Sequence, residues 1–281
     1  MELQIDTRLS QLDPAVQAKW QALLENLRKL GSVMVAFSGG VDSALLSAAA
    51  YHALGDQMLA VTFNSPVEED ESWELAQATA RAVGFPILKV ESHEFDNPNF
   101  VANTPQRCYF CKKETFTNLQ KMARERGFVC AAEGTNADDH HDYRPGMRAV
   151  DEIGVRSPLA EVGLVKSEIR ALAKALELPV WNRPSSPCLA SRIPYGIQVT
   201  RENIGKVAAG EKFLRELGFS PVRVRYERAT ARLEVAPEQI VRLAELHAEV
   251  SAKFKDIGFT YVAVDLGGFR SGSLNEVLKQ K

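Results

Sequence analysis

Apolar and polar residues alternate in blocks along the first two thirds of the chain. Short runs of continuous apolar residues predict buried strands at 33–37, 60–63, 86–90 and 128–133. Amphipathic stretches between and around these runs predict helices at 14–30, 42–54, 66–83, 106–126 and 166–176. Strands that alternate with helices indicate an α/β fold, with right-handed crossovers and a parallel sheet covered on both faces.

Capping signals predict where two of these helices begin. Asp13 followed by Pro14 is a typical helix start, because proline fits the first helical turn. Ser65 and Glu68 have the spacing of a capping box, so we expect the helix after the second strand to begin at Pro66.

The last third of the chain has a different order of elements. The segment WNRPSSPCLASRIPYG is rich in proline and serine and is expected to form an ordered loop or hinge. Beyond it the pattern predicts a helix, a hairpin, a helix and a strand, at 200–217, 222–235, 237–254 and 260–264. We therefore expect an α/β domain over 1–197 and a small α+β domain over 198–281.

Composition and charge narrow the class of protein. The 281 residues carry a formal net charge of -2, which gives no overall attraction for nucleic acid or anionic lipid. The sequence starts without a basic segment followed by an apolar core, and no apolar run approaches the length of a membrane-spanning helix. We expect a cytoplasmic protein with a small-molecule substrate, and neither nucleic acid nor a membrane as a partner.

The stretch VAFSGGVDS joins the first strand to the next helix, where free backbone N–H groups and the positive end of the helix dipole attract an anion. Gly39 and Gly40 permit close approach of the backbone, and Ser38 and Ser43 add hydroxyl donors. Asp42 would repel a phosphate unless a cation lies between them, so it implies Mg²⁺. A glycine-serine turn that only joins strand to helix is the alternative, and Asp42 disfavours it.

A second polar cluster, EGTNADDHHDYRPG, follows the fourth predicted strand and should lie at the same edge of the sheet. Asp138, Asp142 and Arg144 are its candidates for contact with phosphates or substrate. Its two adjacent histidines lack companions at metal-ligand spacing, so exposure to solvent is favoured over metal binding.

The cysteines favour metal or redox chemistry, because four are too few for a disulfide scaffold in a chain of this length. Cys108 and Cys111 lie one helical turn apart, and PCLASR adds Cys188. Three thiolates match a [4Fe-4S] cluster whose fourth iron has no protein ligand. A thiolate pair with a third cysteine that relays a persulfide is the competing hypothesis. The third alternative is that these cysteines are scattered buried residues without a shared role. Cys130, within an apolar run, is expected in the core.

The motif VAFSGGVDS resembles the signature of the N-type ATP pyrophosphatases, the PP-loop superfamily. The resemblance implies the parallel sheet of that fold and the adenylation of a substrate at the α-phosphate of ATP, after which nitrogen or sulfur replaces AMP. Related enzymes have a lysine near the place of Lys166, which implies a contact with the leaving pyrophosphate. An exposed lysine without a role is the alternative.

Several motifs together resemble the LarE sulfur transferases across nearly the whole chain: SGGVDS, EGTNADD with DYRPG, the C-x-x-C, PCLASRIPYG, VRVR and LGGFRSG. The resemblance implies pyridinium-3,5-biscarboxylic acid mononucleotide as substrate, with both carboxylates converted to thiocarboxylates for the nickel-pincer nucleotide cofactor of lactate racemase. It also implies a homo-oligomer. Some members sacrifice one cysteine near PCLASR, and others have three cysteines and use a cluster or a persulfide. This chain has the three-cysteine pattern.

A mononucleotide substrate needs an anchor for its phosphate. Arg223 and Arg225 lie on one face of a predicted strand and are candidates for a bidentate contact with it. Ser191 and Arg192, close to Cys188, are also assigned to the substrate.

Four other charged residues are expected at the solvated surface. Two of them, Glu211 and Glu234, also resemble acidic positions that the family uses in a secondary metal site. The other two are Arg228 and Arg232.

Two further functions compete with the sulfur transferase. A tRNA thiolase of the PP-loop superfamily also combines this loop with three cysteines and an iron-sulfur cluster, but near-neutral charge and the lack of a basic arm disfavour it. A regulator that only binds ATP would leave Asp42, Lys166 and the cysteines without a task.

Overall fold

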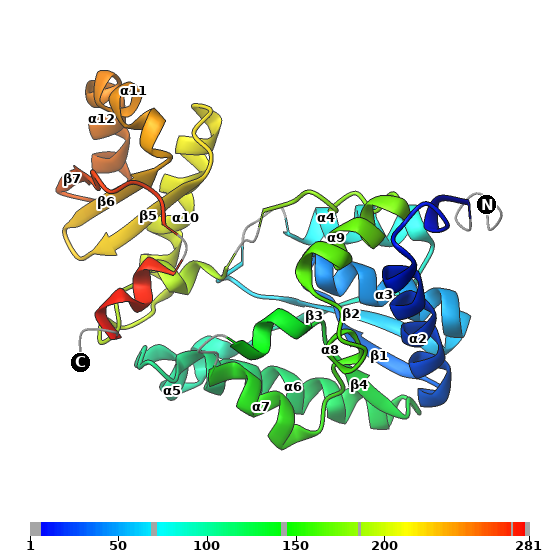
Figure 1. Ribbon diagram of the computed structural model, residues 1–281. Coiled ribbons are helices and arrows are strands. Elements are labelled where there is room, and N and C mark those ends of the chain that lie inside the picture. Colours follow the sequence, from blue (N-terminus) through cyan, green and yellow to red (C-terminus); the bar gives the residue numbers. More distant parts are fainter. Residues whose placement is uncertain (1–6, 69–71, 142–144, 185–186, 271, 279–281) are drawn as a thin grey trace. The chain divides into compact units, whose positions relative to one another are not determined.

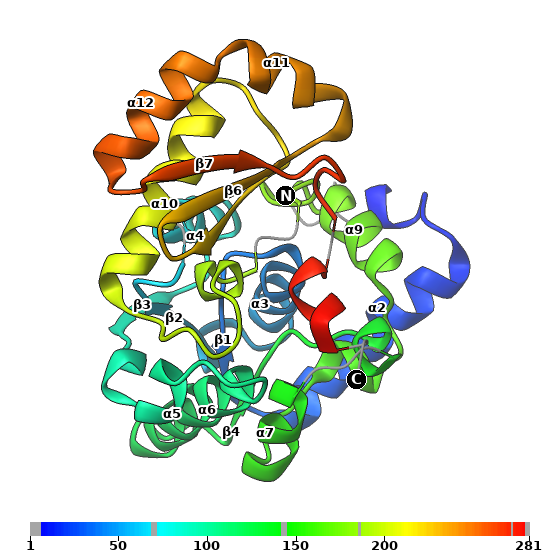
Figure 2. The same ribbon diagram turned by 90° about the vertical axis from the view of Figure 1, so that its left-hand side faces the viewer.

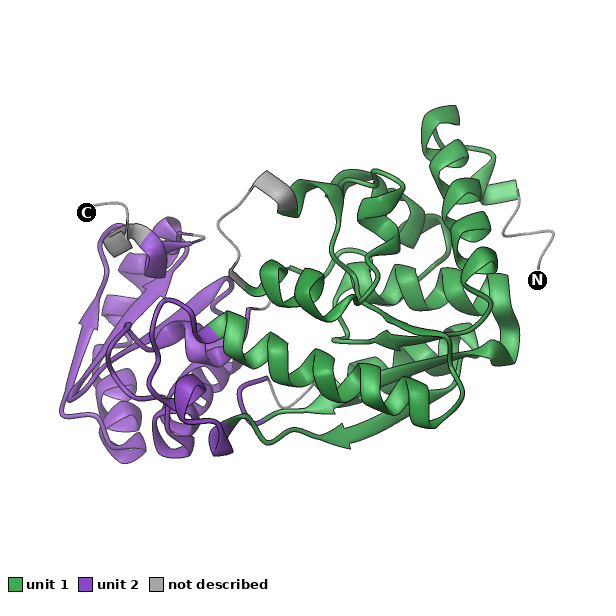
Figure 3. Ribbon diagram, turned by 90° about the horizontal axis from the view of Figure 1, so that it is seen from below, with its two compact units in different colours: residues 1–65, 70–94, 108–186 green, residues 66–69, 95–107, 187–281 purple. Residues whose placement is uncertain are grey.

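The computed structural model describes residues 7–68, 72–141, 145–184, 187–270 and 272–278 (Figure 1). Packing divides the chain into two compact units, coloured separately in Figure 3. Unit 1 comprises 1–65, 70–94 and 108–186, and unit 2 comprises 66–69, 95–107 and 187–281. In the described part of the chain, every helix is too short or too polar to cross a lipid bilayer.

Unit 1 contains the predicted parallel sheet, which confirms the expected fold class. Its strands are β1 (Val33–Ala36), β2 (Met58–Asn64), β3 (Ile87–Glu91) and β4 (Cys130–Ala132), in the order β3-β2-β1-β4. All neighbours are parallel. Because the order reverses beside β1, the loops that follow β1 and β4 border the crevice in which such sheets bind ligands.

Helices cover both faces of this sheet (Figure 1). Alternate residues of a strand point to opposite faces, so Val33 and Val35 lie in one core while Met34 lies in another. The first core is shared with α2 (Pro14–Leu30), α3 (Val41–Leu54), α4 (Ser72–Val83) and α9 (Lys166–Ala175). The second is shared with α6 (Arg107–Glu125) and α7 (Pro145–Ile153).

The capping signals predict one helix start correctly and one wrongly. Asp13 caps α2, and its carboxylate accepts a hydrogen bond from the Ala15 N–H at 2.8 Å. The helix expected from Pro66 begins only at Ser72. Residues 66–68 form a turn, and the Ser65 hydroxyl before it donates to Glu94. Three helices of the described residues were not predicted: α5 (Pro98–Val101), α7 (Pro145–Ile153) and α8 (Pro158–Glu161).

Unit 2 contains a three-stranded sheet, seen with its helices in Figure 2. The predicted hairpin is confirmed as β5 (Val222–Glu227) and β6 (Thr230–Val235), and β7 (Tyr261–Val264) pairs with β6 in parallel. The predicted helix before the hairpin is α10 (Arg201–Glu216).

One long helix was expected at 237–254. The chain instead forms a short 3₁₀ turn, α11 (Ile240–Glu245) and α12 (His247–Ile257), because Leu246 leaves the helical conformation at φ -85° and ψ 17°.

The segment PCLASRIPYG belongs to unit 2, so the division of the chain at 186/187 differs from the boundary expected at 197/198. The reason is its hydrogen bonding to the segment 95–107. The Asn103 amide donates to the carbonyl oxygens of Ile193, Pro194 and Ile197 at 3.3, 2.9 and 2.7 Å. These bonds join residues about 90 positions apart, which local sequence patterns do not reveal.

Candidate active site

The loop after β1 is held in place by the two serines of SGGVDS. The Ser43 hydroxyl accepts from the Ser38 N–H at 3.2 Å and donates to the Gly40 carbonyl at 3.0 Å. Gly39 has a φ of +73°, which favours glycine. Gly40 caps α3 without a side-chain hydrogen bond, so the N–H groups of the first turn are available to an anion.

The loop after β4 lies directly against the first turn of α3. A Cβ atom on Gly134 would lie 2.9 Å from the Ser43 nitrogen and 3.2 Å from the Asp42 carbonyl carbon, and neither backbone atom can yield cheaply. Two residues on, the Asn136 amide donates to the Asp42 carboxylate at 3.3 Å. Neither Gly134 nor Asn136 was singled out from the sequence, although both lie in the EGTN stretch.

A third segment reaches the same place from α9. The Lys166 ammonium forms an ion pair with the Asp42 carboxylate, and the two side chains are 32% and 22% exposed. The Lys166 N–H donates to the Asp138 carboxylate at 2.8 Å. The structure therefore brings Lys166 and Asp138 to the loop, and an ammonium lies where the sequence analysis expects a cation beside Asp42.

Arg183 is a further cationic residue beside the loop that the sequence analysis missed. One of its guanidinium nitrogens lies 4.0 Å from the position that a Cβ of Gly39 would occupy. The Arg170 guanidinium donates to the Arg183 carbonyl at 2.8 Å, which anchors the backbone there. The predicted residues Asp142 and Arg144 lie outside the described residues.

The C-x-x-C motif lies in the first turns of α6. Cys108 is exposed, whereas Cys111 is half-buried. Between them, the buried Tyr109 donates through its hydroxyl to Glu152 on α7 at 2.6 Å, and the Arg148 guanidinium lies 4.0 Å from the centre of its ring. The bond from Tyr109, with a second from Lys113, lowers the pKa of Glu152 below its ordinary value.

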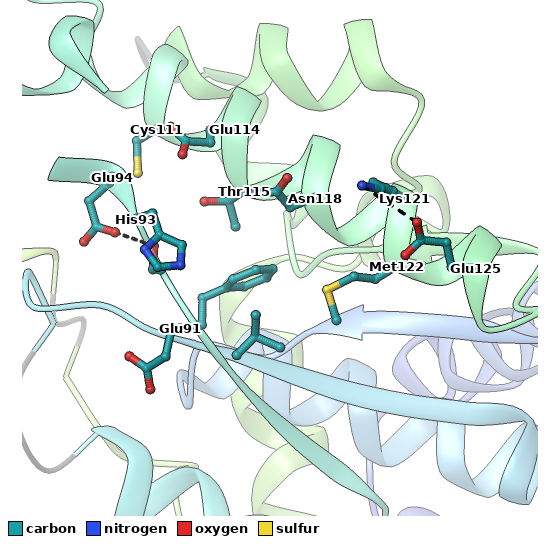
Figure 4. Close-up of a pocket in the computed structure, with 13 residues that line it drawn as sticks. Glu91, His93, Glu94, Cys111, Glu114, Thr115, Asn118, Lys121, Met122 and Glu125 are labelled. Carbon is teal, nitrogen blue, oxygen red and sulfur yellow. Dashed lines mark hydrogen bonds and ion pairs between the residues drawn. The ribbon is translucent and has the colours of Figure 1, made fainter. Parts of the chain in front are cut away.

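Cys111 also lines a cavity of about 260 Å³ in unit 1, between α6 and the end of β3 (Figure 4). His93, Glu94 and Glu114 line the same cavity. Glu94 is buried and accepts hydrogen bonds from the Ser65 and Ser92 hydroxyls. Two hydroxyl donors therefore satisfy this buried carboxylate.

In unit 2, the residues near Cys188 are engaged with buried carboxylates. Arg192 is fully buried and forms a bidentate pair with Glu211 at 2.7 and 2.9 Å. Arg225 forms a similar pair with Glu234 at 2.9 and 2.8 Å. The half-buried Arg223 has its guanidinium 5.1 Å from the ring centre of Phe269.

Of the four surface predictions in unit 2, those for Glu211 and Glu234 were wrong. Glu211 and Glu234 are fully buried, because each accepts hydrogen bonds from an arginine. The Arg232 side chain is half-buried, at 31% exposure, and pairs with Glu227, Glu234 and Asp265. Arg228 is exposed as expected.

Asp265, one partner of Arg232, has a perturbed acidity. Burial alone would raise its pKa. The Gly267 N–H and the nearby guanidiniums of Arg232 and Arg270 lower it by more, so the pKa of Asp265 lies below its ordinary value.

Comparison with curated proteins identifies the family. The chain is 38% identical over 261 residues to the pyridinium-3,5-bisthiocarboxylic acid mononucleotide synthase of Lactiplantibacillus plantarum, covering 92% of this chain and 95% of that protein. This chain belongs to the LarE family of these synthases. An uncharacterised protein of Synechocystis is 44% identical over 264 residues, 92% of this chain and 98% of its own length.

The N-terminal part of this LarE family member is also similar to other synthases. The NAD synthase family model matches residues 16–134, which include β1 and the SGGVDS loop. The glutamine-hydrolysing GMP synthase of Lactobacillus gasseri is 27% identical over 206 residues, 66% of this chain and 39% of that protein. These matches cover less of the chain than the similarity to the bisthiocarboxylic acid synthase, which extends into unit 2.

The three predicted cysteine ligands come from both units of this LarE family member. Cys108 and Cys111 lie in unit 1, and Cys188 lies in unit 2. Among the described residues, no three His, Cys, Asp or Glu side chains gather as a metal site. A site shared by the three cysteines requires residues of both units and stays a prediction. Cys130 packs beside the first core and is half-buried, and this burial raises the pKa of its thiol.

Proposed function

We propose that this chain is an ATP-dependent, AMP-forming sulfur transferase of nickel-pincer nucleotide biosynthesis. It adenylates the carboxylates of pyridinium-3,5-biscarboxylic acid mononucleotide and converts them to thiocarboxylates. The observation that carries the proposal is the similarity, across 92% of the chain, to a protein named for the bisthiocarboxylic product. The geometry of the SGGVDS loop supports the ATP-dependent half of the reaction.

In this proposal the pyrophosphate end of ATP binds at the start of α3. The uncapped N-terminus of α3 and the backbone of Gly39 offer N–H groups, and the hydroxyls of Ser38 and Ser43 lie in the same loop. The close approach of Gly134 keeps the opposite loop from filling this space with a side chain. These features fit a phosphate chain.

Asp42 is the proposed protein ligand of Mg²⁺. Magnesium sites with substrate phosphates commonly use one or two carboxylates, and the partly exposed Asp42 provides one at the mouth of the loop. Magnesium supplies charge neutralisation for the leaving pyrophosphate. Lys166, now paired with Asp42, is within reach of the same oxygens, so it stabilises the charge that develops as the substrate carboxylate displaces pyrophosphate.

The sulfur is proposed to come from a site formed by Cys108, Cys111 and Cys188. The exposure of Cys108 and the one-turn spacing to Cys111 suit a pair of thiolate ligands on one helix. A bound [4Fe-4S] cluster supplies a sulfide at its open iron, and a persulfide relayed among the same thiolates is the alternative. An acyl-adenylate hydrolyses easily, so the donor must wait beside the activated carbon and exclude water.

For the substrate, we assign phosphate binding to Arg223 and Arg225. Ser191, Arg192, Asp142 and Arg144 are assigned to further contacts with the nucleotide. We further propose that the enzyme works in the cytoplasm as a homo-oligomer. The near-neutral net charge of -2 supports a small substrate rather than a polyanion.

Product analysis tests the proposal. Incubation of the anaerobically purified protein with ATP, Mg²⁺ and the biscarboxylic mononucleotide should yield a nucleotide in which sulfur replaces oxygen, detected by mass spectrometry. Cys188→Ser should abolish this product, while Cys130→Ser should keep it. Product formation by Cys188→Ser at the wild-type rate would refute the proposed sulfur site.

A further inference from the structure

Arg107 is a buried cation that has no carboxylate partner in the described part of the chain. It begins α6, directly before Cys108, and is only 2% exposed. One terminal nitrogen, Nη1, donates to the Ala190 carbonyl oxygen at 2.9 Å and to the side-chain oxygen of Asn103. Its Nε and Nη2 atoms have no hydrogen-bond partner among the described residues. A buried charge without a counter-ion is costly, so this edge of the guanidinium is suited to an anion.

Three other arginines of this chain show which group such an edge binds. Arg156, Arg192 and Arg225 each direct Nε and Nη2 at the two carboxylate oxygens of one glutamate, at 2.7 to 2.9 Å. Arg192 and Arg225 also use Nη1 for a backbone carbonyl oxygen. Arg107 makes the same carbonyl contact and lacks only the carboxylate.

The unpaired edge of Arg107 remains accessible to solvent. Among the described residues, the side-chain polar atoms that are sealed from solvent without a partner belong to Asn26 and Ser47, and not to Arg107. An oxygen of a ligand is therefore able to reach Nε and Nη2 without displacing a protein group.

Asn103 holds the guanidinium of Arg107 in a fixed plane. The Asn103 side-chain oxygen accepts from Arg107, and its amide nitrogen donates to three backbone carbonyl oxygens within 193–197. The opposite orientation of the amide would turn its oxygen toward those three oxygens, so only the orientation described satisfies the group. Because the Ala190 carbonyl is a second fixed contact, the edge is oriented before a ligand binds, which lowers the entropic cost of binding.

Arg107 is connected to both of the segments that carry the proposed cysteine site. The peptide bond keeps the Cα atoms of Arg107 and Cys108 about 3.8 Å apart. Ala190, which accepts from Arg107, is two residues after Cys188, so the Cα atoms of these two residues lie within about 7 Å of each other. An anion on Arg107 is therefore held close to residues assigned to sulfur transfer.

We propose that Arg107 binds a carboxylate of the pyridinium substrate through Nε and Nη2. The proposal rests on the proposed function for the identity of this ligand. A carboxylate fits because its two oxygens match the planar fork, as in the three glutamate pairs. The substrate has two carboxylates, so one stays on Arg107 while the other reacts with ATP. This contact is additional to the assignment of Arg223 and Arg225 to the phosphate.

Binding measurements that change both the ligand and the residue test the proposal. Calorimetry compares the biscarboxylic mononucleotide with its 3,5-dicarboxamide analogue, which keeps the ribose phosphate and lacks both carboxylates. For the wild type, the Kd of the dicarboxamide should be roughly 10- to 100-fold higher, the scale of losing charge-assisted hydrogen bonds. Arg107→Gln keeps a donor for the Ala190 carbonyl but removes the charge and the fork, so this ratio of Kd values should shrink about tenfold or more.

The matched control is Arg228→Gln, at the exposed turn between β5 and β6, which should keep the wild-type ratio. An unchanged ratio in Arg107→Gln would overturn the proposal. Equal losses of affinity for the two ligands would also overturn it, because they would indicate a contact with the phosphate or a purely structural role.

A crystal structure of the wild type with the biscarboxylic mononucleotide decides the question if Arg107→Gln does not fold. Nε and Nη2 should each lie within about 3.2 Å of a carboxylate oxygen of the ligand. Water or the nucleotide phosphate at this edge would overturn the proposal.

Turnover separates this inference from the proposed function. Arg107→Gln should raise the KM of the mononucleotide for thiocarboxylate formation, and an unchanged KM would refute the inference alone. If the wild type binds the nucleotide through Arg107 but forms no thiocarboxylate, the proposed function fails and the inference stands. If the wild type does not bind the nucleotide, both are refuted.

Discussion

Asp42 is the residue on which the electrostatics of the candidate ATP site depend, because it contacts both Lys166 and Asn136. Asp42→Asn keeps the shape of the side chain and an oxygen acceptor but removes the charge. Pyrophosphate release should fall about a hundredfold or more, the scale of losing one electrostatic stabiliser. An unchanged melting temperature serves as the control for folding, and release at the wild-type rate would show that Asp42 binds no catalytic cation.

Gly134 provides a steric test of the same site. Gly134→Ala would place a Cβ 2.9 Å from the Ser43 nitrogen and force the β4 loop away from α3. A shift of about 1 Å at a reacting site is enough to reduce the rate as much as a hundredfold, so we expect a large loss of pyrophosphate release.

The matched control is Gly205→Ala, on the exposed face of α10, where a new Cβ has no neighbour within 4 Å. It should keep activity and add up to about 1 kcal/mol of stability, because alanine is a better helix former. Equal activity of Gly134→Ala and Gly205→Ala would contradict the close approach of the two loops.

Residue roles were predictable from the sequence only where the motif is local. Ser38, Asp42 and Ser43 lie within six positions, so their spacing is already informative. Asn136 meets Asp42 from 94 positions away, and Arg192 meets Glu211 from 19 away. No local pattern indicates such partners, which is why both glutamates were assigned to the surface.

At the scale of elements, periodicity and caps were informative where local residues determine the start of the helix. The bounds of α2 and α10 follow from Asp13 and Thr200, each of which accepts a backbone hydrogen bond in the first turn. The helix expected at Pro66 starts later, because the Val67 carbonyl accepts from the distant Leu189 N–H rather than from the next helical turn. Tertiary contacts overrode a valid capping pattern there.

The cap of α10 gives a prediction for stability. Thr200 accepts a hydrogen bond from the Asn203 N–H at 3.1 Å, so Thr200→Ala should lower the free energy of unfolding by about 1 kcal/mol. Thr200→Ser keeps the hydroxyl and should change stability by only a few tenths of a kcal/mol. Urea denaturation measures both variants, and equal loss in the two would show that the hydroxyl does not cap the helix.

At the scale of the whole molecule, the parallel sheet and the α+β unit were predictable, but the path of the chain between them was not. The sequence pattern indicated one boundary, whereas packing assigns 66–69 and 95–107 to unit 2 as well. Such assignments depend on bonds like those from Asn103 to the PCLASRIPYG segment.

The proposed cysteine site requires both units and has its own test. Anaerobically purified wild type should contain about four iron and four acid-labile sulfur atoms per chain, as expected for a [4Fe-4S] cluster. Cys108→Ser, Cys111→Ser and Cys188→Ser should each lose most of the iron, and Cys130→Ser should retain it. If the wild type contains iron and Cys188→Ser retains it, Cys188 is not a ligand of the cluster. If iron is absent from all samples, the persulfide is favoured.

The most direct test of the account is the coupling of pyrophosphate release to the substrate. We predict that the wild type releases pyrophosphate from ATP only when the biscarboxylic pyridinium mononucleotide is present. One pyrophosphate should accompany each sulfur transferred. Asp42→Asn should lower both signals about a hundredfold or more, whereas Cys188→Ser should uncouple them by lowering sulfur transfer more than pyrophosphate release. Release of pyrophosphate that does not depend on this nucleotide, or sulfur transfer without ATP cleavage, would contradict the central claim.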